Sequence, residues 1–222
     1  MSQAYPRLMG ALLLLAIGAY YLPWGWHPTA GLSPGARDLA EWTTLHPEAR
    51  AATPPLLPSF CLRVIPGLLA MLLALYATGH QSRLKRWGVG VLALLLALSL
   101  LPPLEWLTVA RADPNYQQQF GLCLLALTTS GGLMRWGTRF PAGTRYAGSI
   151  GLCLAGIVCA AVGTALGLSL INSLGVSVRL GIGSALFAGM LSIIGLINVR
   201  LARAHLRTRN PKIERISDIR PS

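Results

Sequence analysis

The sequence has few charged residues, and acidic residues are the scarcest. Only 12% of its 222 residues are charged, and Asp and Glu together number 7. A soluble domain usually carries about 25% charged residues, so this chain has too little polar surface for a water-facing shell. Because 53% of the residues are hydrophobic, lipid is the expected surrounding for most of the chain. The sequence therefore predicts a membrane protein.

Groups suited to redox, metal or nucleophilic chemistry are also scarce in the apolar segments. All four histidines fall in expected loops or in the tail, and the four cysteines form no CxxC pair. Cysteines inside apolar segments are expected to pack as small side chains. No phosphate-binding or dinucleotide-binding glycine pattern occurs either. We therefore expect no catalytic residues, no cofactor and no metal site, and we do not expect an enzyme.

Long, continuous apolar runs dominate what is present. Backbone polar groups in lipid must be satisfied internally, which favours helices, and a helix needs about 20 apolar residues to cross a bilayer. Six segments qualify or nearly do: 8–24, 60–78, 88–104, 114–134, 147–170 and 176–199. The expected fold is all-α, a bundle of six transmembrane helices over residues 1–204, followed by a basic tail over residues 205–222.

The basic residues predict the orientation of these spans. With the N-terminus in the cytoplasm, most of the 19 basic residues fall on the cytoplasmic side and five of the seven acidic ones outside, which is the usual bias. Only two basic residues are lysines, an arginine preference that hints at a GC-rich bacterial genome. We expect a bacterial cytoplasmic (inner) membrane, with both termini cytoplasmic. Trp24, Trp26, Trp42 and Trp106 are expected at the outer membrane interface, where indole is favoured.

A polar stretch, residues 31–50, falls in the first extracytoplasmic loop. Ser33 and the proline after it predict the start of a short helix, and Arg37 and Glu41 are spaced to pair on its wet face. Its expected apolar stripe consists of Leu39, Trp42 and Leu45. The pattern is typical of an amphipathic helix lying on the membrane surface. It is either a lid or docking surface for an extracytoplasmic partner or solute, or a belt that covers the end of the bundle.

Charged residues gather near the outer ends of the expected spans. Arg63 and Arg179 each lie about one turn inside a span, where an arginine can reach the interface. Glu105 and Asp113 fall at the same level. These four residues form a candidate outer vestibule, acting as an ion-pair gate or an anion site. The alternative is interfacial anchoring without a shared site. Pro66, one turn after Arg63, is expected to kink its helix.

Small residues four apart in the last two spans predict close helix packing. The candidate seam residues are Gly156, Ala160, Gly163, Gly167, Gly181, Ala185 and Gly189. This spacing does not distinguish an internal contact from a homo-oligomer or a membrane protein partner.

The basic tail places Arg200, Arg203 and Arg207 on one helical face. Anionic lipid headgroups are its expected partner, a cytoplasmic protein is the alternative, and nucleic acid is not expected. For the whole chain, the favoured function is a non-catalytic subunit or accessory component of a membrane assembly. The alternative is a small-solute transporter or permease component, with transport through the vestibule near Arg63 and Arg179.

Overall fold

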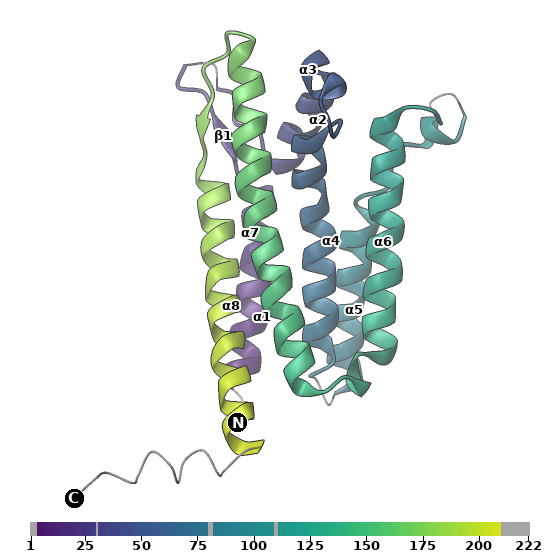
Figure 1. Cartoon of the computed structure of the whole chain (residues 1–222), viewed down its shortest axis with the longest axis vertical. Coiled ribbons are helices and arrows are strands. Elements are labelled where there is room, and N and C mark those ends of the chain that lie inside the picture. Colours follow the sequence, from purple (N-terminus) through teal and green to yellow (C-terminus); the bar gives the residue numbers. More distant parts are fainter. Residues whose placement is uncertain (1–3, 30, 80–81, 109–110, 210–222) are drawn as a thin grey trace, which may run out of the picture.

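The computed structural model describes residues 4–29, 31–79, 82–108 and 111–209, and these are mostly helical. Six long helices run side by side along the molecule (Figure 1). They are α1 (Ala4–Tyr21), α4 (Leu57–Ala77), α5 (Arg83–Leu98), α6 (Pro114–Trp136), α7 (Ala142–Ser173) and α8 (Ile182–Arg209). The predicted all-α architecture is confirmed, and each predicted apolar segment lies largely within one of these helices.

Short elements connect the long helices. They are β1 (Gly25–Trp26), α2 (Ala36–Leu45), α3 (Pro47–Ala51), the 3-10 turns η1 (Leu104–Leu107) and η2 (Gly137–Arg139), and β2 (Arg179–Leu180). β1, α2 and α3 lie together at the end of the bundle drawn uppermost in Figure 1. α1 begins and α8 ends at the opposite end, so the six long helices alternate in direction.

Three helices, α4, α7 and α8, are long and apolar enough to cross a membrane. The other three fall short for physical reasons. α1 has 18 residues and α5 has 16, which at about 1.5 Å per residue gives roughly 27 and 24 Å, against about 30 Å of hydrocarbon. α6 has 23 residues but contains the polar runs 117–119 and 128–130. Length and composition therefore support three spans in the described chain, and not the six predicted.

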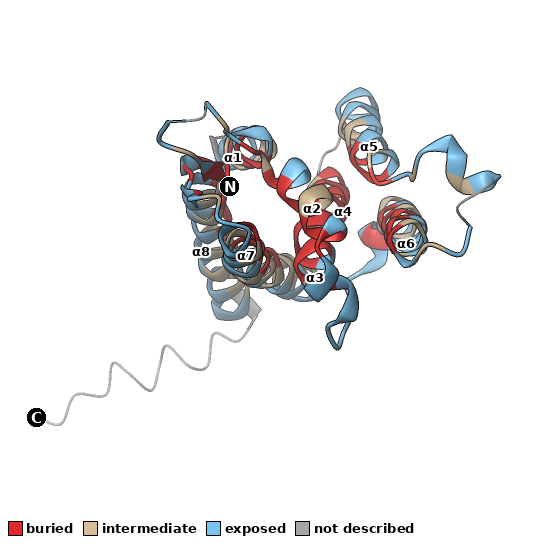
Figure 2. Cartoon of the chain, turned by 90° about the horizontal axis from the view of Figure 1, so that it is seen from above, coloured by how far each residue is buried: buried red, intermediate tan, exposed pale blue. Residues whose placement is uncertain are grey.

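α4 is the central helix. It packs against α5 and α6 on one side and against α1, α2 and α7 on the other, while α8 packs against α7 and α1. Viewed from above, α4 lies between these two groups, with buried residues facing inward (Figure 2). Most of α4 is buried, including Leu62, Ile65 and Leu69. α4 therefore contacts helices on both sides along its length.

The loop before α8 differs from the prediction. The sixth apolar run was expected to be helical from Val176, but α8 begins at Ile182. Arg179 and Leu180 instead form β2, which pairs antiparallel with β1. The N–H of Gly181 then donates to the carbonyl of Trp24 at 2.8 Å. Because this partner lies over 150 positions away in the sequence, no local pattern predicts the strand.

The sequence suggested that Trp24 lies at the membrane interface, but its side chain lies inside the protein. It is fully buried, with its ring centroid 5.5 Å from that of Phe187. Its indole Nε1 donates to the carbonyl of Ala19 at 3.0 Å. Since the indole N–H is satisfied inside the protein, Trp24 acts as a core residue that joins α1 to α8.

The small residues of α7 face neighbouring elements inside the chain. A Cβ built at Gly156 would lie 2.6 Å from Leu191 of α8, and one at Gly163 would lie 2.8 Å from Leu62 of α4. Gly181, directly before α8, closely approaches the backbone of Pro23, whereas Ala185 and Gly189 of α8 are exposed. Gly167 faces Leu39 of α2, and Ala160 is buried.

α2 forms where a short helix was predicted, but it starts later and exposes a different face. Its N-cap is Gly35, whose N–H donates to the Asp38 carboxylate at 3.0 Å. Leu39 is fully buried, whereas Leu45 is 75% exposed. A helix turns about 100° per residue, so positions three apart drift by about 60° and Leu45 lies about 120° from Leu39. The expected stripe of Leu39, Trp42 and Leu45 is therefore not one buried face.

Candidate functional site

Arg63 is a buried cation near the start of α4. Its Nη2 lies 2.8 Å from Oε1 of Glu41 on α2, and its Nη1 donates to Oδ1 of Asn115 on α6. With the Gln119 amide oriented so that its oxygen faces Arg63, that oxygen accepts from Nη1 and Nη2 at 3.1 and 3.2 Å. These four residues, the Arg63 cluster, join α4 to both α2 and α6.

Glu41 pairs with Arg63 and not, as the spacing on α2 suggested, with Arg37. A cation taken out of water needs a nearby anion and further acceptors to offset its desolvation. Arg63 is buried and Arg37 is exposed, so the carboxylate stabilises the buried guanidinium more. For the guanidinium of Arg63, the anion is the Glu41 carboxylate and the further acceptors are the side-chain amides of Asn115 and Gln119.

The other candidate vestibule residues have different surroundings. Asp113 caps α6, because its Oδ1 accepts from the Asn115 N–H at 2.8 Å, and its Oδ2 lies 3.5 Å from Nη2 of Arg50. Glu105 is exposed in η1, and Arg179 is exposed in β2. Within the described chain, no ion pair joins any of these three to Arg63. The structure thus brings together Arg63, Glu41, Asn115 and Gln119.

Asn115 and Gln119 are partners that the sequence reasoning missed. They lie four residues apart on α6, so they share one helical face, and both are buried. A polar run at the start of an otherwise apolar helix was the available signal. This signal does not identify the cation that these amides face.

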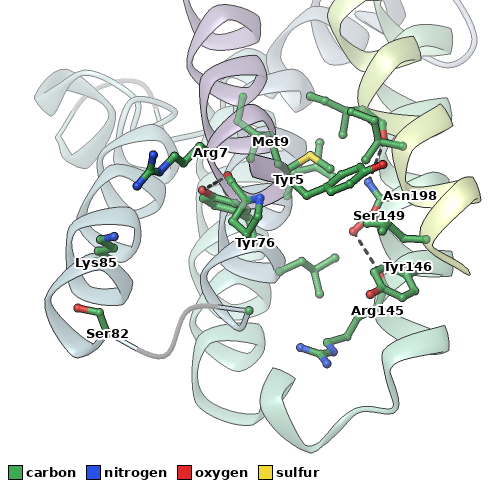
Figure 3. Close-up of a pocket in the computed structure, with 18 residues that line it drawn as sticks. Tyr5, Arg7, Met9, Tyr76, Ser82, Lys85, Arg145, Tyr146, Ser149 and Asn198 are labelled. Atoms are coloured by element: carbon green, nitrogen blue, oxygen red, sulfur yellow. Dashed lines mark hydrogen bonds between the residues drawn. The ribbon is translucent and has the colours of Figure 1, made fainter. Parts of the chain in front are cut away.

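A cavity of about 810 Å³ lies at the opposite end of α4 and is lined by residues of α1, α4, α5, α7 and α8 (Figure 3). Its inner wall is apolar, formed by Met9, Leu13, Leu72, Leu75, Ile194, Ile197 and Leu201. Arg7, Lys85 and Arg145 also line it, and each comes from a different helix. None of the eighteen described residues that line it is acidic. We call this the basic cavity.

Arg145 is the most enclosed of the three cations. Its Nη1 donates to the Thr78 hydroxyl at 3.2 Å, whereas its buried Nε has no hydrogen-bond partner in the structure. A buried donor without a partner costs about 1–3 kcal/mol. Arg7 and Lys85 also line the cavity, and both are exposed.

Tyr76 forms part of the wall between α1 and α4. Its hydroxyl donates to the carbonyl of Pro6 at 2.6 Å, as the dashed line in Figure 3 shows. Gly10 makes room for this contact, since a Cβ there would lie 2.6 Å from the Tyr76 oxygen. The beginning of α1 is therefore fastened to the end of α4 on this side of the cavity.

No protein-family model matches the chain, and no curated protein and no solved structure is significantly similar to it. Its function must therefore be inferred from the chemistry of the two regions. The Arg63 cluster is compact and nearly neutralised within the protein. The lining of the basic cavity combines apolar side chains with three cations, a combination that complements an apolar molecule carrying an anionic head.

Proposed function

We propose that this chain is a non-catalytic component of the bacterial cytoplasmic membrane that binds an anionic amphiphile, such as an anionic phospholipid, in the basic cavity. The observation that carries the proposal is that Arg7, Lys85 and Arg145, from three different helices, line an apolar cavity whose described lining contains no acidic residue. The volume of about 810 Å³ falls in the range of about 300–1,000 Å³ common for ligand sites.

In this proposal all six long helices cross the membrane, with both termini in the cytoplasm. The alternating directions of the helices support it, because α1 begins and α8 ends at one end of the bundle (Figure 1). Exposed arginines of α8, including Arg200, Arg203 and Arg207, lie toward that end, as expected for the cytoplasmic side. α1 and α5 are short, but Arg7 and Lys85 near their ends can extend to the headgroups.

The anionic head is expected to determine selectivity. An acyl chain leaving the bilayer for an apolar cavity exchanges one apolar surrounding for another, so it gains little. Each basic residue near an anionic headgroup contributes about 1 kcal/mol. Three cations therefore favour an anionic over a zwitterionic head by about 3 kcal/mol, or roughly a hundredfold.

Native mass spectrometry of the purified protein tests the proposal. We expect wild-type protein offered equal amounts of phosphatidylglycerol and phosphatidylcholine, with identical chains, to retain phosphatidylglycerol. A Lys85→Gln, Arg145→Gln double variant should lose most of this preference. The matched control is Arg139→Gln, because Arg139 is exposed near the same end of the bundle but does not line the cavity. Equal retention of both lipids by wild type, or equal losses in control and double variant, would refute the proposal.

A second candidate function is small-solute transport. It is favoured by the position of the basic cavity and the Arg63 cluster at opposite ends of α4, a helix that contains Pro66. A proline removes one backbone hydrogen bond and permits bending, which a transporter needs.

Solute uptake by protein reconstituted alone in liposomes would favour this candidate. Stoichiometric co-purification of another membrane protein would instead support an accessory role, in which the exposed Ala185 and Gly189 form the contact face.

A further inference from the structure

The Arg63 cluster is itself neutral, but Arg37 adds a second positive charge next to it. A small space of about 20 Å³ beside it is lined by Arg37, Arg63 and Glu41, and the other lining residues are uncharged. They are Tyr20, Tyr21, Pro66, Ser99, Leu100 and Gln119. Two cations and one carboxylate leave a net charge of +1. We propose that this space is a binding site for a compact monovalent anion, a halide or a carboxylate group, and that Glu41 is its built-in competitor.

The surroundings strengthen the attraction for an anion. Arg63 is buried, and charges interact more strongly in a protein interior than in water because the effective dielectric constant is lower. A guanidinium presents five N–H donors in a planar fork that matches a carboxylate. The carboxylate of Glu41 already uses this chemistry at 2.8 Å. An external carboxylate would make the same contact in its place.

The size of the space limits the ligand. A cavity needs about 10–15 Å³ to hold one water molecule, so about 20 Å³ accommodates a chloride ion or part of a carboxylate group. Sulfate and larger anions would have to displace protein groups other than the Glu41 side chain. The site therefore selects by size as well as by charge.

Glu41 is able to leave without unfolding its helix. Its side chain is 45% exposed, whereas that of Arg63 is 5% exposed, so the carboxylate lies between the buried cation and the solvent. α2 is held in place by its apolar face, in which Ala36, Leu39 and Ala40 are fully buried. Rotation of Glu41 outward would open Arg63 to a solute while α2 stays on the bundle.

A tethered carboxylate competes at a high effective concentration, typically in the millimolar range for a short connection. The wild-type protein should therefore bind external anions weakly, and removal of the Glu41 charge should strengthen binding at least tenfold. Glu41→Gln keeps the size of the side chain and removes its charge, so it is the informative variant.

Thermal unfolding of the detergent-purified protein measures this binding. Acetate or chloride is titrated, and a bulky sulfonate salt keeps the ionic strength constant. Saturating anion should raise the Tm of the Glu41→Gln variant by about 5–10 °C at a hundredfold excess over Kd. Wild type should need at least ten times more anion, and sulfate should give no saturable shift. The Glu48→Gln control should behave as wild type, because Glu48 is an exposed carboxylate on α3 that does not line the space.

Arg37 provides the decisive second variant. Loss of Arg63 could unfold the protein, but Arg37 is exposed, so its replacement should leave the fold intact. In the Glu41→Gln background, Arg37→Gln should weaken acetate and chloride binding at least tenfold. The proposal is overturned if Glu41→Gln shows no saturable stabilisation, or if Arg37→Gln leaves that stabilisation unchanged. The site lies at the other end of α4 from the basic cavity, so this result is independent of the lipid experiment.

Discussion

Replacing glycine by alanine at two positions should have opposite effects on stability. At Gly163 of α7, a new Cβ would lie 2.8 Å from Cγ of Leu62 and 3.1 Å from Cβ of Cys61. These atoms are close to the backbone of α4, and Leu62 is fully buried, so the neighbours cannot simply turn aside. At Gly189 of α8, a new Cβ meets no atom within 4 Å. We therefore expect Gly163→Ala to push α7 away from α4 and Gly189→Ala to be tolerated.

The magnitudes follow from two opposing effects. Alanine favours a helix by up to about 1 kcal/mol over glycine, and this gain applies at both positions. Overpacking a filled core costs about 1–3 kcal/mol, and this cost applies only at Gly163. The free energy of unfolding should fall by about 1 kcal/mol for Gly163→Ala and rise by up to about 1 kcal/mol for Gly189→Ala. This difference of about 2 kcal/mol corresponds to about 4–8 °C in Tm.

Thermal unfolding of both variants in the same mild detergent, followed by circular dichroism, measures the difference. Gly163→Val adds two more methyl groups at the same point and should lower the Tm further. Equal Tm shifts for the two alanine variants would refute the reasoning, because they would mean that Gly163 does not lie against α4. A stabilising Gly163→Ala would lead to the same conclusion.

Two further stability changes depend on close contacts at the end of the bundle that holds α2. Gly181→Ala should lower the Tm more than Gly163→Ala, because its Cβ would lie 2.4 Å from the backbone oxygen of Pro23. A backbone atom cannot move aside as a side chain can. A Tm equal to that of the wild type would contradict this prediction. Leu39→Ala should cost about 2–5 kcal/mol by leaving a cavity, whereas Leu45→Ala, at a mostly exposed position, should change stability by less than about 0.5 kcal/mol. Similar denaturation midpoints for these two variants would show that α2 is not anchored through Leu39.

Sequence patterns were sufficient to predict the helices, although not all of their ends. Apolar runs separated by polar and proline-containing stretches led to six helical segments, and the structure has a long helix at each. The helix over α2 was predicted from the proline after Ser33 and from Pro47, which are local signals. The stripe assigned to α2 was wrong because it was read as a three-residue repeat, whereas a helix has 3.6 residues per turn.

Contacts between distant segments could not be predicted in the same way. β1 and β2 pair across more than 150 positions, and two-residue strands have no periodicity to detect. Trp24 was assigned to an interface because indole often lies there, but a neighbouring carbonyl satisfies its N–H inside the core. Glu41 was assigned to Arg37, its neighbour on the same helix, although the buried cation of α4 gains more from the carboxylate.

The amino-acid sequence alone determined that the chain is helical and apolar, and that its basic residues follow a regular alternation along the chain. These properties depend on residues close together in sequence, because a helix satisfies its backbone within each turn. Only the tertiary structure decided which charged residues share a site: Glu41 pairs with Arg63, and Arg7, Lys85 and Arg145 line one cavity. Such groups come from different helices, and their distances depend on how the helices pack, which no local pattern records.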